Sequence, residues 1–87
     1  MNLKILRRAE KQIRKLPKTV QIAIGLNLRE LTRGQAYSEK KLQGYENMYR
    51  LRVGSYRVVY ERRGEDMFVL LVEHRKDIYQ SLERLFG

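Results

Sequence analysis

The stretch YRLRVGSYRVVY, residues 49–60, alternates between two kinds of side chain and therefore predicts a β-hairpin. Gly54-Ser55 forms a two-residue loop of the kind favoured in tight hairpins, so that Val53 pairs with Tyr56. Because successive side chains point to opposite faces of a strand, one face holds aliphatic and tyrosine side chains: Tyr49, Leu51, Val53, Tyr56, Val58 and Tyr60. The other face holds Arg50, Arg52, Arg57 and Val59. We predict that the first face belongs to the core and that the second carries positive charge.

Two helices are predicted before the hairpin, because apolar residues recur there at spacings of three and four. The first helix, in residues 6–16, has the stripe Leu6, Ala9, Ile13 and Leu16; the second has Val20, Ala23, Ile24, Leu28 and Leu31. Pro17 separates them, since proline interrupts helical hydrogen bonding. The two segments therefore form a helical hairpin. Ile22 and Leu26 stand off the second stripe, and we expect them to pack against another part of the fold rather than under a partner chain.

The remaining segments complete an α+β pattern. MNLKIL predicts an opening strand, and residues 34–39 read as a polar loop. MFVLLVE is apolar on both faces, which is typical of a strand with neighbours on both sides, so we place it between YRVVY and the opening strand. In the tail DIYQSLERLF, helical spacing relates Ile78, Leu82 and Leu85, with Asp77 suited to the helix start.

The predicted fold is a helical hairpin packed on a small, mainly antiparallel β-sheet, in the order β-α-α-β-β-β followed by a C-terminal helix or turn. The 87 residues are enough for one domain, residues 1–87, with a modest core.

Composition narrows the class of function. Nineteen Lys and Arg against ten Asp and Glu give a formal net charge of +9, which favours an acidic or nucleic-acid partner over a merely solvated basic surface. The chain has no cysteine and one histidine, so it has neither disulfides nor a thiolate metal site, and we expect no metal or other cofactor. We see no apolar run long enough to span a bilayer and no signal peptide, and we expect no membrane partner and a cytoplasmic location.

Basic residues gather on the polar side of the first helix and before the first arginine strand. These are Arg7, Lys11, Arg14, Lys15 and Lys18, followed by Lys40 and Lys41. The residues from Arg7 to Lys18 fall opposite the apolar stripe of the first helix and form what we call the basic ridge. We predict that these residues bind the backbone of a nucleic acid.

The hairpin register predicts a candidate site, because it places Arg52 directly opposite Arg57. Like charges in that position cost up to about 1 kcal/mol, so the arrangement makes most sense if an anion lies across it. The segment EHRKDIY adds His74, Arg75 and Tyr79 near the end of the cluster. Arginine matches phosphate oxygens but stays charged, so proton transfer would fall to Tyr79 or His74.

This grouping suggests a site that cleaves phosphodiesters without a metal, although each part has a simpler interpretation. The arginines could form a face that binds RNA without catalysis. Tyr79 could be a core residue of the tail helix, and His74 could be structural or face solvent.

Residues 41–80, KLQGYENMYRLRVGSYRVVYERRGEDMFVLLVEHRKDIYQ, resemble the RelE/ParE superfamily of bacterial and archaeal toxins. In that superfamily a KL-x-G lead-in, a Y-R-[IL]-R-x-G-x-Y-R-[VI]-x-Y hairpin and a terminal H-R-x-x-[IV]-Y recur. The resemblance implies two helices packed on a small antiparallel sheet. RelE-type members are ribosome-dependent ribonucleases that cut mRNA in the A site through the 2′-hydroxyl of the nucleotide, without a metal. ParE-type members poison DNA gyrase and generally lack the C-terminal arginine and tyrosine.

The resemblance assigns roles residue by residue. Arg57 matches the arginine that contacts the scissile phosphate, Arg75 matches a second phosphate-directed arginine, and Tyr79 matches the tyrosine that stacks on or deprotonates the cleavage site. Arg50 and Arg52 stand where well-studied RelE-type enzymes carry lysines. Arginine does not release a proton readily, so either Tyr79 or His74 is the base, or electrostatic stabilisation dominates.

From these matches we expect a metal-independent mRNA endoribonuclease that inhibits translation, with mRNA on the ribosome as its substrate. The resemblance implies ribosomal RNA as the RNA that the basic ridge and Lys40 and Lys41 bind. The expected catalytic residues are Arg52, Arg57, Arg75 and Tyr79, with Arg50 and His74 as supporting or acid–base residues. The resemblance also implies a cognate RelB-like antitoxin that masks the arginine face or displaces the C-terminal helix. The alternatives are a ParE-type gyrase inhibitor and a non-catalytic nucleic-acid-binding relative.

Overall fold

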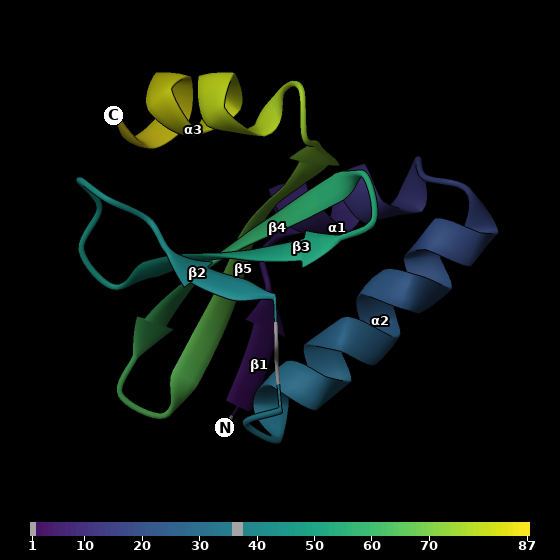
Figure 1. Ribbon diagram of the computed structural model, residues 1–87, viewed down its shortest axis with the longest axis horizontal. Helices are drawn as coiled ribbons and strands as arrows, with labels where there is room; N and C mark the ends of the chain where they lie inside the picture. Colours follow the sequence, from purple (N-terminus) through teal and green to yellow (C-terminus); the bar gives the residue numbers. More distant parts are fainter. Residues whose placement is uncertain (1, 36–37) are drawn as a thin grey trace.

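A computed structural model of the protein describes residues 2–35 and 38–87, which form a five-stranded sheet and three helices (Figure 1). The elements in chain order are β1 (Asn2–Ile5), α1 (Arg7–Arg14), α2 (Lys18–Thr32), β2 (Glu39–Lys41), β3 (Met48–Val53), β4 (Tyr56–Arg63), β5 (Asp66–His74) and α3 (Ile78–Phe86). The α+β class, the helical hairpin broken at Pro17 and the C-terminal helix are all confirmed. None of the described helices is long and apolar enough to cross a membrane.

The strands are arranged in the order β1-β5-β4-β3-β2. β1 runs parallel to β5, and all other neighbours are antiparallel, so the sheet is mainly antiparallel as predicted. The apolar strand β5 lies between β1 and β4, which confirms its expected place. It is buried on both faces over Val69, Leu70, Leu71 and Val72.

Strand β2 was not predicted. It pairs with β3 through only three residues, two of them lysines, so the sequence there has no alternating apolar signal. Part of the predicted polar loop, at residues 36–37, lies outside the described residues.

A first core lies between the sheet and the helical hairpin. It contains Ala9 of α1, Ile24, Leu28 and Leu31 of α2, and Leu51, Val53, Val58, Tyr60, Met67, Val69 and Val72 of the sheet. The core includes most of the apolar face of the 49–60 hairpin, and the other residues of the two predicted stripes pack against it, partly buried: Ile13, Leu16, Val20 and Ala23. Leu6 is the exception, because it precedes α1 and is 41% exposed, so its predicted place in the core is wrong. The apolar side of the helices and the apolar face of the hairpin therefore pack against each other in a single core, as expected.

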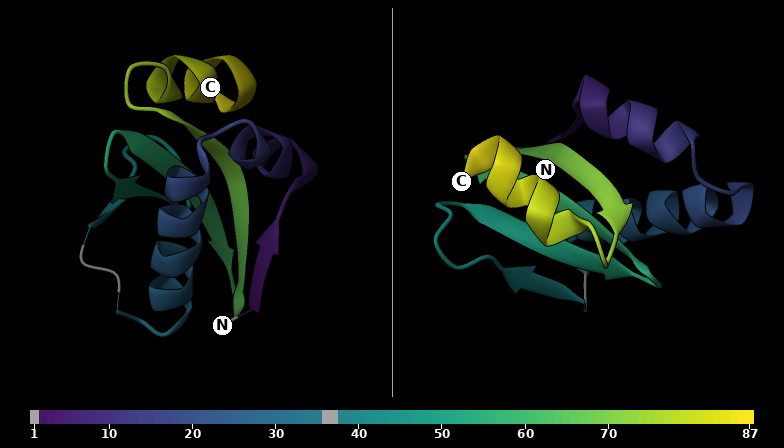
Figure 2. Two further views of the ribbon diagram at one scale, coloured as in Figure 1. Left: turned by 90° about the vertical axis from the view of Figure 1, so that its right-hand side faces the viewer. Right: turned by 90° about the horizontal axis from the view of Figure 1, so that it is seen from above.

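A second core covers part of the opposite face, the one expected to carry charge. There α3 packs Ile78 and Leu82 against Val59 and Leu71, so α3 and the helical hairpin lie on opposite sides of the sheet (Figure 2). Leu85 joins this cluster, which confirms the predicted stripe of the tail. The arginine face is thus divided into an apolar part under α3 and a charged part beside it.

The two apolar residues off the stripe of α2 are exposed. Ile22 and Leu26 keep 55% and 57% of their accessible surface. The expectation that another part of the fold would cover them is wrong, because α2 contacts the sheet through its other side, with Ile24, Leu28 and Leu31.

Candidate active site

The hairpin between β3 and β4 places two arginines side by side. Val53 pairs with Tyr56 and Arg52 pairs with Arg57, which confirms the predicted register. Gly54 supplies the left-handed backbone, with φ of 59°, at the first position of the loop. Direct cross-strand partners have Cβ atoms about 4.5–5.5 Å apart, so the two arginine side chains leave the sheet next to each other on the same face.

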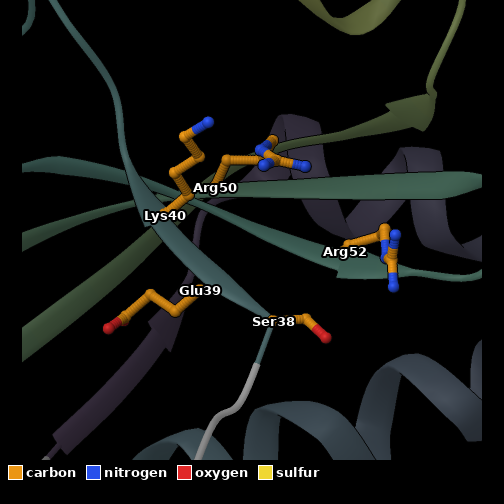
Figure 3. Close-up of a pocket in the computed structure, with 5 residues that line it drawn as sticks. All are labelled: Ser38, Glu39, Lys40, Arg50 and Arg52. Atoms are coloured by element: carbon orange, nitrogen blue, oxygen red, sulfur yellow. The ribbon is translucent and has the colours of Figure 1, made fainter.

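Strand β2 adds a third row of positive charge. Lys40 pairs directly with Arg50, and Lys40, Arg50 and Arg52 line a shallow hollow of about 250 Å³ together with Ser38 and Glu39 (Figure 3). Lys40 and Arg50 extend to the same side, whereas Glu39 points away from them (Figure 3). The Glu39 carboxylate accepts a hydrogen bond from Arg62 at 2.7 Å, so its charge is paired outside the cluster.

Arg57 lies at the centre of the cluster. Its Nη1 donates hydrogen bonds to the carbonyl oxygens of Gly54, at 2.9 Å, and Tyr56, at 3.0 Å, which fixes the guanidinium against the hairpin turn. Burial lowers the pKa of Arg57, and the positive charges of Arg50, Arg52 and Arg75 lower it further, whereas Tyr79 acts in the opposite direction. The ionisable groups whose charges reach Arg57 are therefore Arg50, Arg52, Arg75 and Tyr79, which we call the arginine cluster together with Arg57.

Arg57 has no acidic partner in the described part of the chain. None of the ion pairs there involves its guanidinium. Its Nε and Nη2 donors also have no hydrogen bonds to described residues. The group is therefore held in place through Nη1 while its other donors remain available to an anion.

The C-terminal segment brings Arg75 and Tyr79 to this area. The Arg75 amide donates to the Ser55 carbonyl oxygen at 2.8 Å, so the backbone stays beside the hairpin loop beyond the end of β5. Tyr79 lies in the first turn of α3, next to the buried anchor Ile78, and is 51% exposed. The interpretation of Tyr79 as a core residue is therefore wrong.

His74 is not brought together with the arginines. It pairs with Tyr56, whose side chain lies on the face that packs against α2, and the two rings meet edge to face with centroids 5.6 Å apart. Its Nδ1 accepts a hydrogen bond from the Lys76 amide at 3.2 Å. Of the two predicted proton carriers, only Tyr79 lies near Arg57.

The predicted basic ridge is exposed to solvent. α1 carries Arg7, Lys11 and Arg14, Lys15 follows directly at its C-terminal end, and Lys18 starts α2. Arg7, Lys11 and Lys15 line a hollow of about 380 Å³, which Arg8 also lines. Arg8 was missed, although its spacing from Lys11 and Lys15 is helical and could have revealed it. Arg14 is partly neutralised by an ion pair with Glu10 at 3.0 Å.

Lys41 lies apart from Lys40. It pairs with Tyr49, so it faces the side of the sheet opposite the arginine cluster. Of the two predicted RNA-binding lysines before β3, only Lys40 therefore joins the cluster, a distinction that required the unpredicted strand β2.

The arrangement can bind a phosphodiester and move a proton. Guanidinium groups bind phosphate oxygens and stabilise negative charge, and a phenol can exchange a proton with a nearby hydroxyl. Among residues 2–35 and 38–87, no group of three or more His, Asp or Glu side chains could hold a metal ion. The groups at hand for chemistry are the arginines, Lys40 and Tyr79.

The sequence is similar to toxins of toxin–antitoxin systems. Residues 3–79 match the sequence model of a family described as the ParE toxin of the type II toxin–antitoxin system parDE. Toxin RelE3 of Methanocaldococcus jannaschii is 34% identical over 74 residues, covering 79% of this chain and 84% of the relative.

Solved structures of similar fold include two RelE toxins. One, from the RelB–RelE antitoxin–toxin complex of Methanococcus jannaschii, has a TM-score of 0.77 and 29% identity, covering 90% of this chain and 96% of the other. The other, the isolated E. coli RelE toxin, has a TM-score of 0.71 and 26% identity, covering 98% of each chain.

Proposed function

The chain belongs to the RelE/ParE family of type II toxins, and from this premise we propose that it is a metal-independent endoribonuclease that cleaves mRNA in the A site of the ribosome. Translation in the cytoplasm is then its target. The observation that carries the proposal is the position of Arg57, fixed by two backbone carbonyls and surrounded by Arg50, Arg52, Arg75 and Tyr79.

The proposed reaction uses the 2′-hydroxyl of the nucleotide before the cut. Tyr79, acting as the phenolate, accepts the hydroxyl proton, directly or through water, while the 2′-oxygen attacks the adjacent phosphorus. The bond from phosphorus to the 5′-oxygen breaks, and that oxygen takes up a proton from water. The products are a 2′,3′-cyclic phosphate and a 5′-hydroxyl. Negative charge grows on the phosphate oxygens in the transition state, where fixed donors such as Arg57 lower the barrier most.

We further propose a RelB-like antitoxin as the protein partner. The RelE toxin of M. jannaschii that this chain resembles was solved in a complex with RelB. A net charge of +9 and an open arginine cluster favour an acidic segment that competes with RNA for the same face.

A ParE-type role is the second candidate, because the family model that matches residues 3–79 is described by the ParE toxin. The presence of Arg75 and Tyr79 beside Arg57 favours the ribonuclease instead. Neither residue has an evident use in a protein that acts only by binding gyrase.

We expect purified protein to cut mRNA only when ribosomes are translating it, because the site offers backbone contacts and no evident means of reading sequence. Primer extension in a translation extract measures this directly. Breaks in phase with codons should appear with ribosomes and vanish without them. Intact mRNA together with inhibited gyrase supercoiling would support the ParE-type role.

We also expect the basic ridge on α1 to contribute to ribosome binding but not to the chemical step. Changing Lys11, Arg14 and Lys15 together to glutamine should weaken ribosome association. Each lost phosphate contact lowers the slope of log K against log salt by about 0.7 for single strands and 0.9 for duplex, so the slope should fall by about 2 to 3. Cleavage within the bound complex should continue at the parental rate.

The matched control removes the same charge elsewhere. Arg29, Arg33 and Arg84 are exposed on α2, just after α2 and on α3, and their joint change to glutamine should leave most of the affinity and the slope intact. Equal losses in the two triple variants would mean that only net charge matters and that the ridge makes no specific contact.

A further inference from the structure

Glu73 lies directly opposite Arg57 in the register of β4 and β5, yet no ion pair joins them in the described part of the chain. Direct cross-strand partners are close enough for such a pair. Instead, the Glu73 carboxylate accepts hydrogen bonds from Gln12 Nε2 at 2.8 Å and from Ser81 Oγ at 2.6 Å. Glu73, the acidic register partner of Arg57 on β5, thus accepts hydrogen bonds from two neutral donors instead of pairing with the guanidinium.

Both donors are themselves held in place. Gln12 Oε1 accepts a hydrogen bond from the Val72 amide at 2.8 Å. The pairing of β1 with β5 ends at Ile5 and Val69. Beyond that point, the Gln12 side-chain amide forms the hydrogen bond with the edge of β5. Ser81 is 6% exposed and lies on α3 next to Leu82 of the second core. The end of β5 lies between α1 and α3 (Figures 1 and 2), and Glu73 connects both helices there.

We propose that Gln12 and Ser81 hold the Glu73 carboxylate away from Arg57 and so keep the guanidinium free for a phosphate. Their hydrogen bonds stabilise the Glu73 carboxylate, which therefore needs no cationic side chain as a partner. If one donor is lost, the carboxylate can turn to Arg57 and neutralise part of the site. Gln12, Glu73 and Ser81 are then positioning residues. The inference rests on the proposed function only in treating Arg57 as the phosphate-binding group.

The test is a titration of the intact protein with inorganic phosphate, followed by NMR at the Arg57 Nε–Hε signal. Ser81→Ala removes one donor, and a partly exposed ion pair between Glu73 and Arg57 would then compete with phosphate, so the affinity should fall about two- to fivefold. Adding Glu73→Gln to Ser81→Ala should restore the parental affinity, because the competing charge is gone. Gln12→Leu, which acts from the other side of the carboxylate, should behave in the same way.

Thr32→Ala is the control, since the Thr32 hydroxyl donates only to the Arg29 carbonyl at the end of α2; it should leave phosphate affinity unchanged. Unchanged affinity in both Ser81→Ala and Gln12→Leu would overturn the inference. So would a loss that Glu73→Gln does not restore, because that loss would come from packing alone. The inference would also be overturned if the Arg57 Nε–Hε signal of the parental protein did not shift when phosphate is added. Phosphate binding without RNA cleavage would reject only the proposed function.

Discussion

Arg57→Ala should reduce mRNA cleavage by about 100- to 1,000-fold, because it removes a fixed donor from the position where phosphate charge develops. The guanidinium is held by the Gly54 and Tyr56 carbonyls before any substrate arrives, so little reorganisation is required during the reaction. The measurement is single-turnover cleavage on programmed ribosomes. In cells, the same substitution should abolish growth inhibition.

The folding stability of Arg57→Ala should change little. The substitution relieves repulsion from Arg52, worth up to about 1 kcal/mol. It also loses two hydrogen bonds, one exposed and one part-buried; at the low end of about 0.5–1.5 kcal/mol each they total about 1 kcal/mol, so the two effects nearly cancel. A structural arginine would lose activity and stability together. Thermal unfolding of the variant therefore distinguishes the two roles.

Arg63→Ala provides the matched control for Arg57→Ala. Arg63 ends the same strand, β4, but pairs with Glu61 at 2.9 Å and is not among the charged neighbours of Arg57. We expect its loss to leave cleavage near the parental rate. If both variants lose activity equally, net charge and not the Arg57 site controls the reaction.

Tyr79→Phe should slow single-turnover cleavage by about 100-fold or more, since positioned proton transfer typically contributes 10²- to 10⁴-fold. Tyr79 is 51% exposed and outside both cores, so removal of its hydroxyl should not alter folding. Its ring remains able to stack on a base. Ribosome affinity should therefore be retained while the chemical step slows.

Tyr45→Phe is the control, because Tyr45 packs beside the second core and not beside Arg57. It should cleave at the parental rate. A parental rate in Tyr79→Phe would instead remove the phenol from the mechanism and leave electrostatic stabilisation by the arginines as the main contribution.

Much of the fold could be predicted from the sequence because its strongest local signals agree with the tertiary structure. The alternation in residues 49–60 placed Arg52 opposite Arg57, and the helical stripes placed Ile24 and Leu28 in the first core. The burial of β5 on both faces was visible as an uninterrupted apolar run.

The parts that were missed depend on long-range contacts with weak local signals. Strand β2 is three polar residues long and exists because β3 offers a free edge. The second core needs α3 folded back over Val59 and Leu71, which no periodicity reveals. The position of His74 followed from its pairing with Tyr56, and that pairing requires the register between β4 and β5, including the irregularity at Val59/Tyr60.

The parallel pairing of β1 with β5 has a consequence for how the protein folds during its own synthesis. β1 emerges from the ribosome before β5, so Asn2 meets its partner, Asp66, only after the helical hairpin and strands β2 to β4 have been made. Pairings of such high sequence separation form late, because the entropy of closing a long loop must be paid first. Tyr79, in the last helix, emerges later still. A nascent chain that has emerged only as far as β4 therefore lacks both the strand that β1 pairs with and the Arg75 and Tyr79 side chains whose charges reach Arg57.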